Sequence, residues 1–170
     1  YAIDTEELIA DYPSASTHLM DGNVYYMDYG LSTGMYYYNK DLWTEAGLTD
    51  GDIPKTWDEF IDVAQKLTKF DEDGNMIQAG YNYNNYFNST VIGLNYQFGD
   101  NLFSADGKES LVDGKGMKEA TSFLIDLYEK YRVGDKDFGT NYDQSFYQGQ
   151  SAIVFAWGFF VGNLATNAPD

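Results

Sequence analysis

Cysteine is absent from this sequence, and histidine occurs once, at His18. Without thiols the chain cannot form disulfides, thiolate zinc sites, iron–sulfur clusters or a cysteine nucleophile. A single imidazole also excludes a metal site built from several histidines. We therefore expect neither a metal ion nor a cofactor in this protein.

Positively charged residues are scarce. Ten Lys and Arg residues stand against 27 Asp and Glu residues, which gives a net charge of −17. Nucleic-acid binding needs clustered Lys and Arg, and anionic membrane surfaces repel a chain of this charge. The longest apolar run, residues 151–161, is far shorter than the ~20 residues that span a bilayer. We expect no nucleic-acid partner and no membrane span.

Aromatic residues are abundant instead. They make up 18% of the 170 residues, within an apolar fraction of 44%. Acidic disordered chains are poor in aromatics, so this composition predicts a packed core. The length fits one to one and a half domains at ~150 residues per domain. The chain begins at Tyr1 with neither a Met nor a basic signal region, so we expect it to start inside a longer protein.

Two segments carry strong helix patterns. Thr56 and Glu59 are spaced as a capping box, and they open a helix that we expect to end near Lys69. A second helix is predicted over residues 115–132. Both predictions rest on apolar residues that recur every three or four positions: Phe60, Val63, Ala64 and Leu67 in the first helix, and Met117, Ala120, Leu124, Leu127 and Tyr131 in the second.

Runs rich in Tyr, Phe and β-branched residues predict strands between the helices. Weaker patterns predict helices over residues 40–46, 84–98 and 158–167, and a short hairpin within residues 102–112. The alternation of strands and helices indicates an α/β layered fold, with too few strands for a complete large sheet. The predicted strands are Val24–Tyr29, Gly34–Tyr38, Ile77–Tyr83 and Ser151–Trp157.

Sequence signatures of catalysis and phosphate binding are missing. The P-loop pattern does not occur, and residues 149–153 lack the second glycine of a nucleophile elbow. The acidic segment 71–75 has its glycine at the fourth position rather than the sixth of a calcium loop, so a turn is the simpler interpretation. The many acidic residues leave one enzymatic alternative open, a glycoside hydrolase with two paired carboxylates.

Aromatic and amide side chains cluster outside the helical stripes. Flat rings stack on the C–H faces of a sugar, while amide and phenol groups bond its hydroxyls. Packing in a core is the competing interpretation, because strands favour Tyr and Phe in any case. The alternation of Tyr and Asn over residues 81–88 favours a binding site, because buried amides need partners. The other clusters are residues 25–29, 36–38 and 157–160.

Several motifs, in a consistent order, resemble one protein family. This family is the extracellular solute-binding protein family 1 of ABC importers, the sugar-binding type related to maltose-binding protein. The resemblance extends over residues 20–165. It is carried by Asp21-Gly-Asn-Val-Tyr-Tyr-Met-Asp-Tyr-Gly30, Met35-Tyr-Tyr-Tyr-Asn-Lys-Asp-Leu42, Glu45-Ala-Gly-Leu48, Pro54-Lys-Thr-Trp-Asp-Glu-Phe60 and Phe146-x-x-Gly149-x-Ser-Ala152-x-Val-x-x-x-Trp157.

The resemblance implies a periplasmic-binding-protein-like fold of type II. In this α/β fold two lobes are joined by crossing segments, and the ligand lies in the cleft between them. A full member is well over twice as long as this chain. We therefore expect the end of the first lobe and the crossover at residues 1–33, and most of the second lobe, still incomplete, at residues 34–170. Closure about a hinge would follow ligand binding.

Ligand-contacting positions of the family correspond here to two crossover residues, two residues of the second lobe and two aromatics near the last strand. Trp157 matches a Trp that commonly stacks on a sugar ring, although a core position at a strand end would use the same residue type. Asp28 stands where the family's crossover has proline. In chain order the six are Tyr29, Ser32, Tyr86, Asn88, Trp157 and Phe159.

The resemblance implies a non-enzymatic, substrate-binding component of an ABC importer. Such a protein binds a sugar or oligosaccharide and delivers it to the membrane permease. The resemblance also implies a monomer in a bacterial extracellular setting, either periplasmic or anchored as a lipoprotein. A glycoside hydrolase stays the alternative, and a surface adhesion domain is a third hypothesis.

Overall fold

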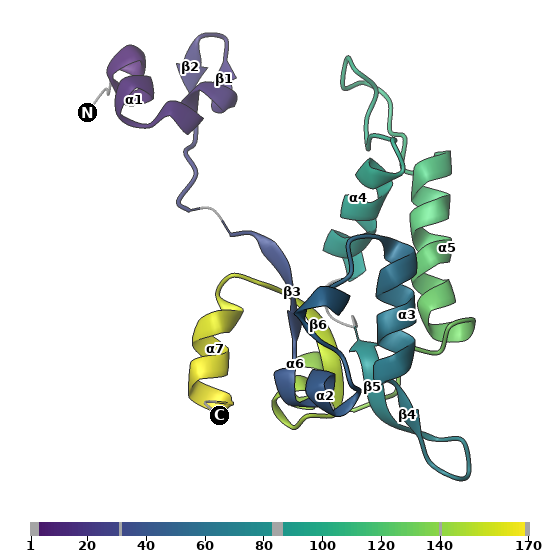
Figure 1. The fold of residues 1–170 in the computed structure, drawn as a ribbon. Coiled ribbons are helices and arrows are strands. Elements are labelled where there is room, and N and C mark those ends of the chain that lie inside the picture. The colour runs from purple at the N-terminus through teal and green to yellow at the C-terminus, as the bar shows by residue number, and fades with distance from the viewer. Residues whose placement is uncertain (1–3, 31, 83–86, 140, 169–170) are drawn as a thin grey trace. The chain divides into compact units, whose positions relative to one another are not determined.

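The computed structural model describes residues 4–30, 32–82, 87–139 and 141–168 (Figure 1). Contacts divide the chain into two compact units, residues 1–33 and residues 34–170. The assignment of these units to a first and a second lobe stays a prediction.

The first unit consists of short elements. Its hairpin turns through Asp21 and Gly22, which both have positive φ. Two central residues with positive φ form the type I′ turn that an Asp-Gly pair favours. Ala15 is the one buried apolar residue among the described residues of this unit. The elements are α1 (Thr5–Asp11), the 3-10 helix η1 (Pro13–His18), β1 (Leu19–Met20) and β2 (Asn23–Val24).

The strand predicted over Val24–Tyr29 is wrong. Pairing ends at Val24, and the side chains of Tyr25, Tyr26 and Tyr29 are exposed. Tyr favours strands because its ring packs on a half-buried sheet surface. Residues 25–30 have no partner strand among the described residues, so no sheet surface is present on which their Tyr rings could pack.

A four-stranded sheet organises the second unit. The strand order is β3-β6-β5-β4, with β5 and β6 parallel and the two outer strands antiparallel to their neighbours. The limits of β3 and β6 are as predicted, and β5 begins one residue before its predicted start, while its predicted last residue, Tyr83, lies outside the described residues. The strands are β3 (Gly34–Tyr38), β4 (Lys69–Phe70), β5 (Met76–Asn82) and β6 (Ser151–Trp157).

Helices cover both faces of this sheet. Alternate residues of β3 and β6 point to opposite faces, so Tyr38 and Ile153 enter a core with α3, α4 and α5, while Tyr37 and Val154 enter a second core with α6 and α7 (Figure 1). The helices are α2 (Lys40–Glu45), the 3-10 helix η2 (Asp50–Asp52), α3 (Trp57–Leu67), α4 (Phe87–Gln97), α5 (Lys115–Glu129), α6 (Tyr142–Tyr147) and α7 (Phe160–Asn167).

The two strong helix predictions are confirmed. At the start of α3, the Thr56 hydroxyl accepts a hydrogen bond from the Glu59 backbone N–H, and the Glu59 carboxylate accepts one from the Thr56 N–H, both at 3.2 Å. The apolar stripes of α3 and α5 are largely buried. The long helix ends at Glu129 rather than Arg132, because Arg132 has φ of 53°, outside the helical region.

Three weaker elements differ from prediction. The described part of the helix predicted over residues 84–98 is α4, and residues 84–86 lie outside the described residues. The expected hairpin is a single bridge between Phe103 and Ser110. The helix α6 was not predicted, because its polar and aromatic residues lack a helical stripe. Its N-cap is Asn141, whose side chain accepts a hydrogen bond from the Gln144 backbone N–H.

Candidate ligand-binding site

The carboxyl ends of β5 and β6 lie at one edge of the sheet, because these strands run parallel. They end at Asn82 and Trp157, and β3 begins at the same edge, where Gly34 pairs with Trp157. In open α/β sheets, ligands bind outside the carboxyl ends of the strands. We call this the carboxyl edge and take it as the candidate site.

The amide of Asn82 stabilises the fold at this edge. Its side chain is fully buried. The Tyr128 hydroxyl donates a hydrogen bond to its Oδ1 at 2.5 Å, and its Nδ2 donates one to the Phe138 carbonyl at 3.3 Å. Tyr81 is buried beside it. The first part of the Tyr–Asn alternation is therefore core, and the sequence argument that it favours a ligand site is wrong there.

Two aromatic rings lie at the end of β6. Trp157 is half-buried and packs edge-to-face on Phe155, with the ring centroids 5.9 Å apart. Its backbone carbonyl accepts a hydrogen bond from the Tyr37 hydroxyl at 3.2 Å, which fixes the strand end. Phe159 immediately precedes α7, and 56% of its surface is exposed. At the carboxyl edge, the Trp157 ring is thus fixed by packing and the Phe159 ring is exposed to solvent.

The other predicted residues are distributed over both units. Asn88 is exposed in the first turn of α4, which begins five residues after β5 ends. Tyr86 lies outside the described residues. Tyr29 and Ser32 are exposed and belong to the first unit. Of the predicted residues, Trp157 and Phe159 lie at the carboxyl edge, and Asn88 lies on the helix that follows β5.

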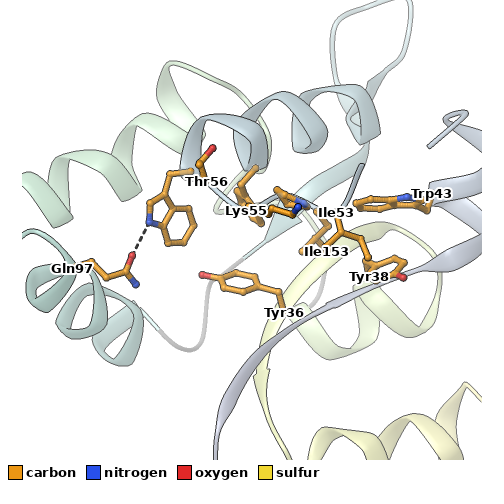
Figure 2. Close-up of a pocket in the computed structure, with 11 residues that line it drawn as sticks. Tyr36, Tyr38, Trp43, Ile53, Lys55, Thr56, Gln97 and Ile153 are labelled. Carbon is orange, nitrogen blue, oxygen red and sulfur yellow. Dashed lines mark hydrogen bonds between the residues drawn. The ribbon is translucent and has the colours of Figure 1, made fainter. Parts of the chain in front are cut away.

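A separate cavity of about 400 Å³ lies on the face of the sheet that α3 covers (Figure 2). We call it the aromatic groove. None of the five predicted site residues that the structure describes lines it. The sequence analysis included Tyr36 and Tyr38 in an aromatic cluster outside the helical stripes. It did not predict a surface role for Trp57, because Trp57 is the first residue of a predicted helix, where an aromatic residue usually packs in the core. The groove is lined by Tyr36, Tyr38, Trp43, Ile53, Pro54, Lys55, Thr56, Trp57, Phe60, Gln97 and Ile153.

The hydrogen-bonding groups of the aromatic groove are largely occupied. The indole N–H of Trp57 donates to the Gln97 side-chain oxygen at 2.9 Å, shown dashed in Figure 2, and that of Trp43 donates to the Thr49 carbonyl at 3.0 Å. Burial raises the pKa of Tyr36 to about 12, while a side-chain hydrogen bond with Tyr81 acts in the opposite direction. The groove therefore presents mainly apolar ring surface.

The carboxylates with shifted pKa values lie in turns. Hydrogen bonds, chiefly from the side chains of Thr49, Asn75 and Ser104, lower the pKa values of Asp52, Asp71 and Asp106 respectively. The Asp71 carboxylate also accepts hydrogen bonds from the backbone within residues 71–75, so the turn predicted there is confirmed. Among the described residues, no three His, Asp or Glu side chains gather as a metal site would require.

None of the helices in the described part of the chain combines the length and the hydropathy that a membrane span requires.

The sequence profile of the bacterial extracellular solute-binding proteins matches residues 2–170. The chain belongs to this family. Among curated relatives, the solute-binding chain is 27% identical over 166 aligned residues to the sn-glycerol-3-phosphate-binding periplasmic protein UgpB of Shigella flexneri. That alignment covers 89% of this chain and 36% of the relative.

Solved structures of solute-binding proteins share the fold. An ABC substrate-binding protein from Listeria monocytogenes, in complex with cycloalternan, has a TM-score of 0.75 at 21% identity, over 92% of this chain and 40% of that chain. An ABC transporter solute-binding protein from Thermotoga lettingae, bound to α-D-tagatose, has a TM-score of 0.75 at 22% identity, over 100% and 46%. The fold is of the periplasmic-binding-protein-like type II, as predicted. This chain spans less than half the length of each of these three proteins.

Proposed function

We propose that the full-length protein is the substrate-binding component of a bacterial ABC importer and that it binds a neutral sugar or oligosaccharide at the carboxyl edge. The observation that carries this proposal is the placement of Trp157 and Phe159 at the carboxyl edge of a chain from the solute-binding family. Ligands occupy this edge in open α/β sheets. Aromatic rings there provide stacking platforms.

The binding chemistry follows from the residue types. The ring of Trp157, supported by Phe155, stacks on the apolar face of a sugar, and Phe159 adds a second apolar surface. The amide of Asn88 can both donate to and accept from sugar hydroxyls. Tyr29, Ser32 and Tyr86 complete the site in this proposal. Closure of the two lobes about a hinge then encloses the ligand, and opening at the permease releases it.

The cellular setting forms part of the same proposal. The protein acts as a monomer outside the cytoplasmic membrane, in the periplasm or held by a lipid anchor. Its macromolecular partners are the permease subunits of the importer.

The charge of the chain favours a neutral ligand over a phosphate ester. Phosphate recognition relies on Arg or Lys donors. None of the six proposed site residues is cationic, and the chain has a net charge of −17. The name of the Shigella relative makes sn-glycerol 3-phosphate the second candidate ligand.

The pKa values of three carboxyl groups support ligand binding rather than glycoside hydrolysis. A glycosidase needs a general acid whose pKa is raised, as well as a second carboxylate nearby. The pKa values of Asp52, Asp71 and Asp106 are lowered instead, by hydrogen bonds from neighbouring residues. These carboxylates stabilise loops, which is a structural role.

Calorimetry on the full-length protein tests this function. The protein is titrated with a panel of neutral oligosaccharides and, separately, with sn-glycerol 3-phosphate, and each mixture is assayed for new reducing ends. We expect binding of a neutral sugar without turnover. New reducing ends would establish the hydrolase, and binding of glycerol phosphate alone would establish the second candidate ligand.

A further inference from the structure

The aromatic groove is an exposed apolar surface that the proposed sugar site does not use. Tyr36 and Ile53 expose 40% and 43% of their surfaces, although they lie beside the main core. The groove extends along β3, and no strand pairs with the outer side of β3 among the described residues. Exposed apolar clefts and open strand edges mark surfaces that another element covers.

The chemistry of the groove does not suit a sugar. A bound sugar must exchange its hydrogen bonds to water for bonds to the protein, and each unpaired hydroxyl is costly. Both indole N–H groups already have protein acceptors, and the Tyr36 side chain shares a hydrogen bond with Tyr81. Figure 2 shows the side-chain oxygen of Gln97 bonded to the Trp57 indole. Lys55 and Thr56 add polar groups to the lining, but most of the groove is aromatic ring surface and the side chains of Ile53, Pro54 and Ile153, which match apolar side chains.

The source of these side chains follows from the lengths of the relatives. The alignments cover 36% of the Shigella protein and 40% and 46% of the two structures. More than half of each of those proteins therefore lies outside the region that this chain matches. A cavity of about 400 Å³ admits several apolar side chains from such additional polypeptide.

We propose that, in the full-length protein, polypeptide from outside residues 1–170 covers the aromatic groove and inserts apolar side chains against Tyr36, Ile53 and Trp57. The groove is then an internal packing surface of the lobe and not a second ligand site. This proposal depends on the family and on the groove, and it is independent of the sugar proposal.

Hydroxyl-radical labelling of the full-length protein tests whether the aromatic groove is covered. Tyr36 is compared with Tyr96, which is 52% exposed on α4 and does not line the groove. Because both are tyrosines, their intrinsic reactivities match, and the urea-unfolded protein gives the reference for each. We expect labelling of Tyr36 to be lost in the native protein while labelling of Tyr96 persists. Native labelling of Tyr36 to the same extent as Tyr96 would show an open groove and overturn the proposal.

Two further results would also overturn it. Protection of Tyr36 only when sugar is added would make the groove a ligand site. Protection that rises with protein concentration would make the occupant a second copy of the protein. Sugar affinity itself is not part of this test, so a failed sugar proposal leaves the result interpretable.

A pair of isoleucine variants gives an independent measurement. Ile53→Glu places a charge in the groove, and Ile125→Glu places one on α5, where the side chain is 51% exposed. If the groove is covered, Ile53→Glu lowers the melting temperature of the full-length protein by about 4 °C or more relative to Ile125→Glu. Equal melting temperatures would mean that Ile53 faces water, contrary to the proposal.

Discussion

The hydroxyl of Tyr128 on α5 donates a hydrogen bond of 2.5 Å to the buried Oδ1 of Asn82 at the end of β5. This bond joins the helical layer to the strand that leads to the candidate site. We expect Tyr128→Phe to lower the free energy of unfolding by about 1–3 kcal/mol, because the buried amide oxygen loses its partner. Urea unfolding of the purified variant measures the change.

A double-mutant cycle separates this bond from the rest of the packing. Asn82→Leu and Tyr128→Phe are combined, and the two single losses are compared with the double loss. Residues that share a hydrogen bond give a coupling energy of about 0.5–3 kcal/mol. Strictly additive losses would show that the bond contributes nothing.

Gly80 is required by close packing between β5 and α3. A Cβ at this position would lie 1.9 Å from the Ala64 carbonyl oxygen and 2.7 Å from the Thr68 hydroxyl. We expect Gly80→Ala to destabilise the protein by about 1–3 kcal/mol, the usual cost of overpacking. Thermal unfolding measures this change.

Gly93 on α4 is the matched control, because a Cβ there meets nothing within 4 Å. Alanine favours a helix over glycine by about 1 kcal/mol, so Gly93→Ala should stabilise. A loss of stability in both variants would contradict the packing argument.

Tyr36 gives a pH dependence of stability. Its pKa is raised from 10.0 to about 12, so the unfolded chain releases this proton at a lower pH than the folded chain does. The unfolded state then binds fewer protons between these two values, and stability falls as the pH rises through that range. Tyr36→Phe should reduce this fall, as measured by unfolding at a series of alkaline pH values. An unchanged slope would mean that the hydroxyl is solvated.

Trp157 should carry a large share of sugar affinity in the full-length protein. We expect Trp157→Ala to weaken binding at least tenfold, which corresponds to about 1.4 kcal/mol, because the stacking platform is lost. Phe159→Ala should cause a smaller loss. Calorimetry with the sugar identified in the titration panel measures both.

Trp57→Phe is the control for this prediction, since it changes an indole outside the carboxyl edge. Its sugar affinity should equal that of the unmodified protein. Unchanged affinity in Trp157→Ala would assign Trp157 to the core.

Secondary structure was predicted correctly where the residues of one short segment determine it by themselves. The limits of β6 were predicted without error because its apolar, β-branched and aromatic run follows Gly149 and Gln150 and is followed by Gly158, and α3 was predicted from the capping box at Thr56. The strand predicted after Val24 failed because strand formation needs a partner that sequence alone does not supply. The helix α6 was missed for a different reason, because its residues carry no apolar stripe and its main local signal is the Asn141 cap.

The candidate site was only partly predictable for a related reason. The aromatic character of residues 157–160 is visible in the sequence, and the parallel pairing of β5 with β6 then places it at the carboxyl edge. The partners of Asn82 come from residues 46 and 56 positions away, so its structural role could not be inferred locally. The groove likewise depends on the approach of Trp57 to Gln97, 40 residues apart.

The pairing of Gly34 with Trp157 has a consequence for the residue that the start of β3 can accept. The Phe155 ring lies so close over Gly34 that an added Cβ would come within 2.4 Å of it. A side chain at position 34 would therefore displace either the Phe155 ring, on which Trp157 packs, or the backbone pairing at the end of β6. Glycine at the first residue of the second unit is thus a requirement of the aromatic surface at the carboxyl edge.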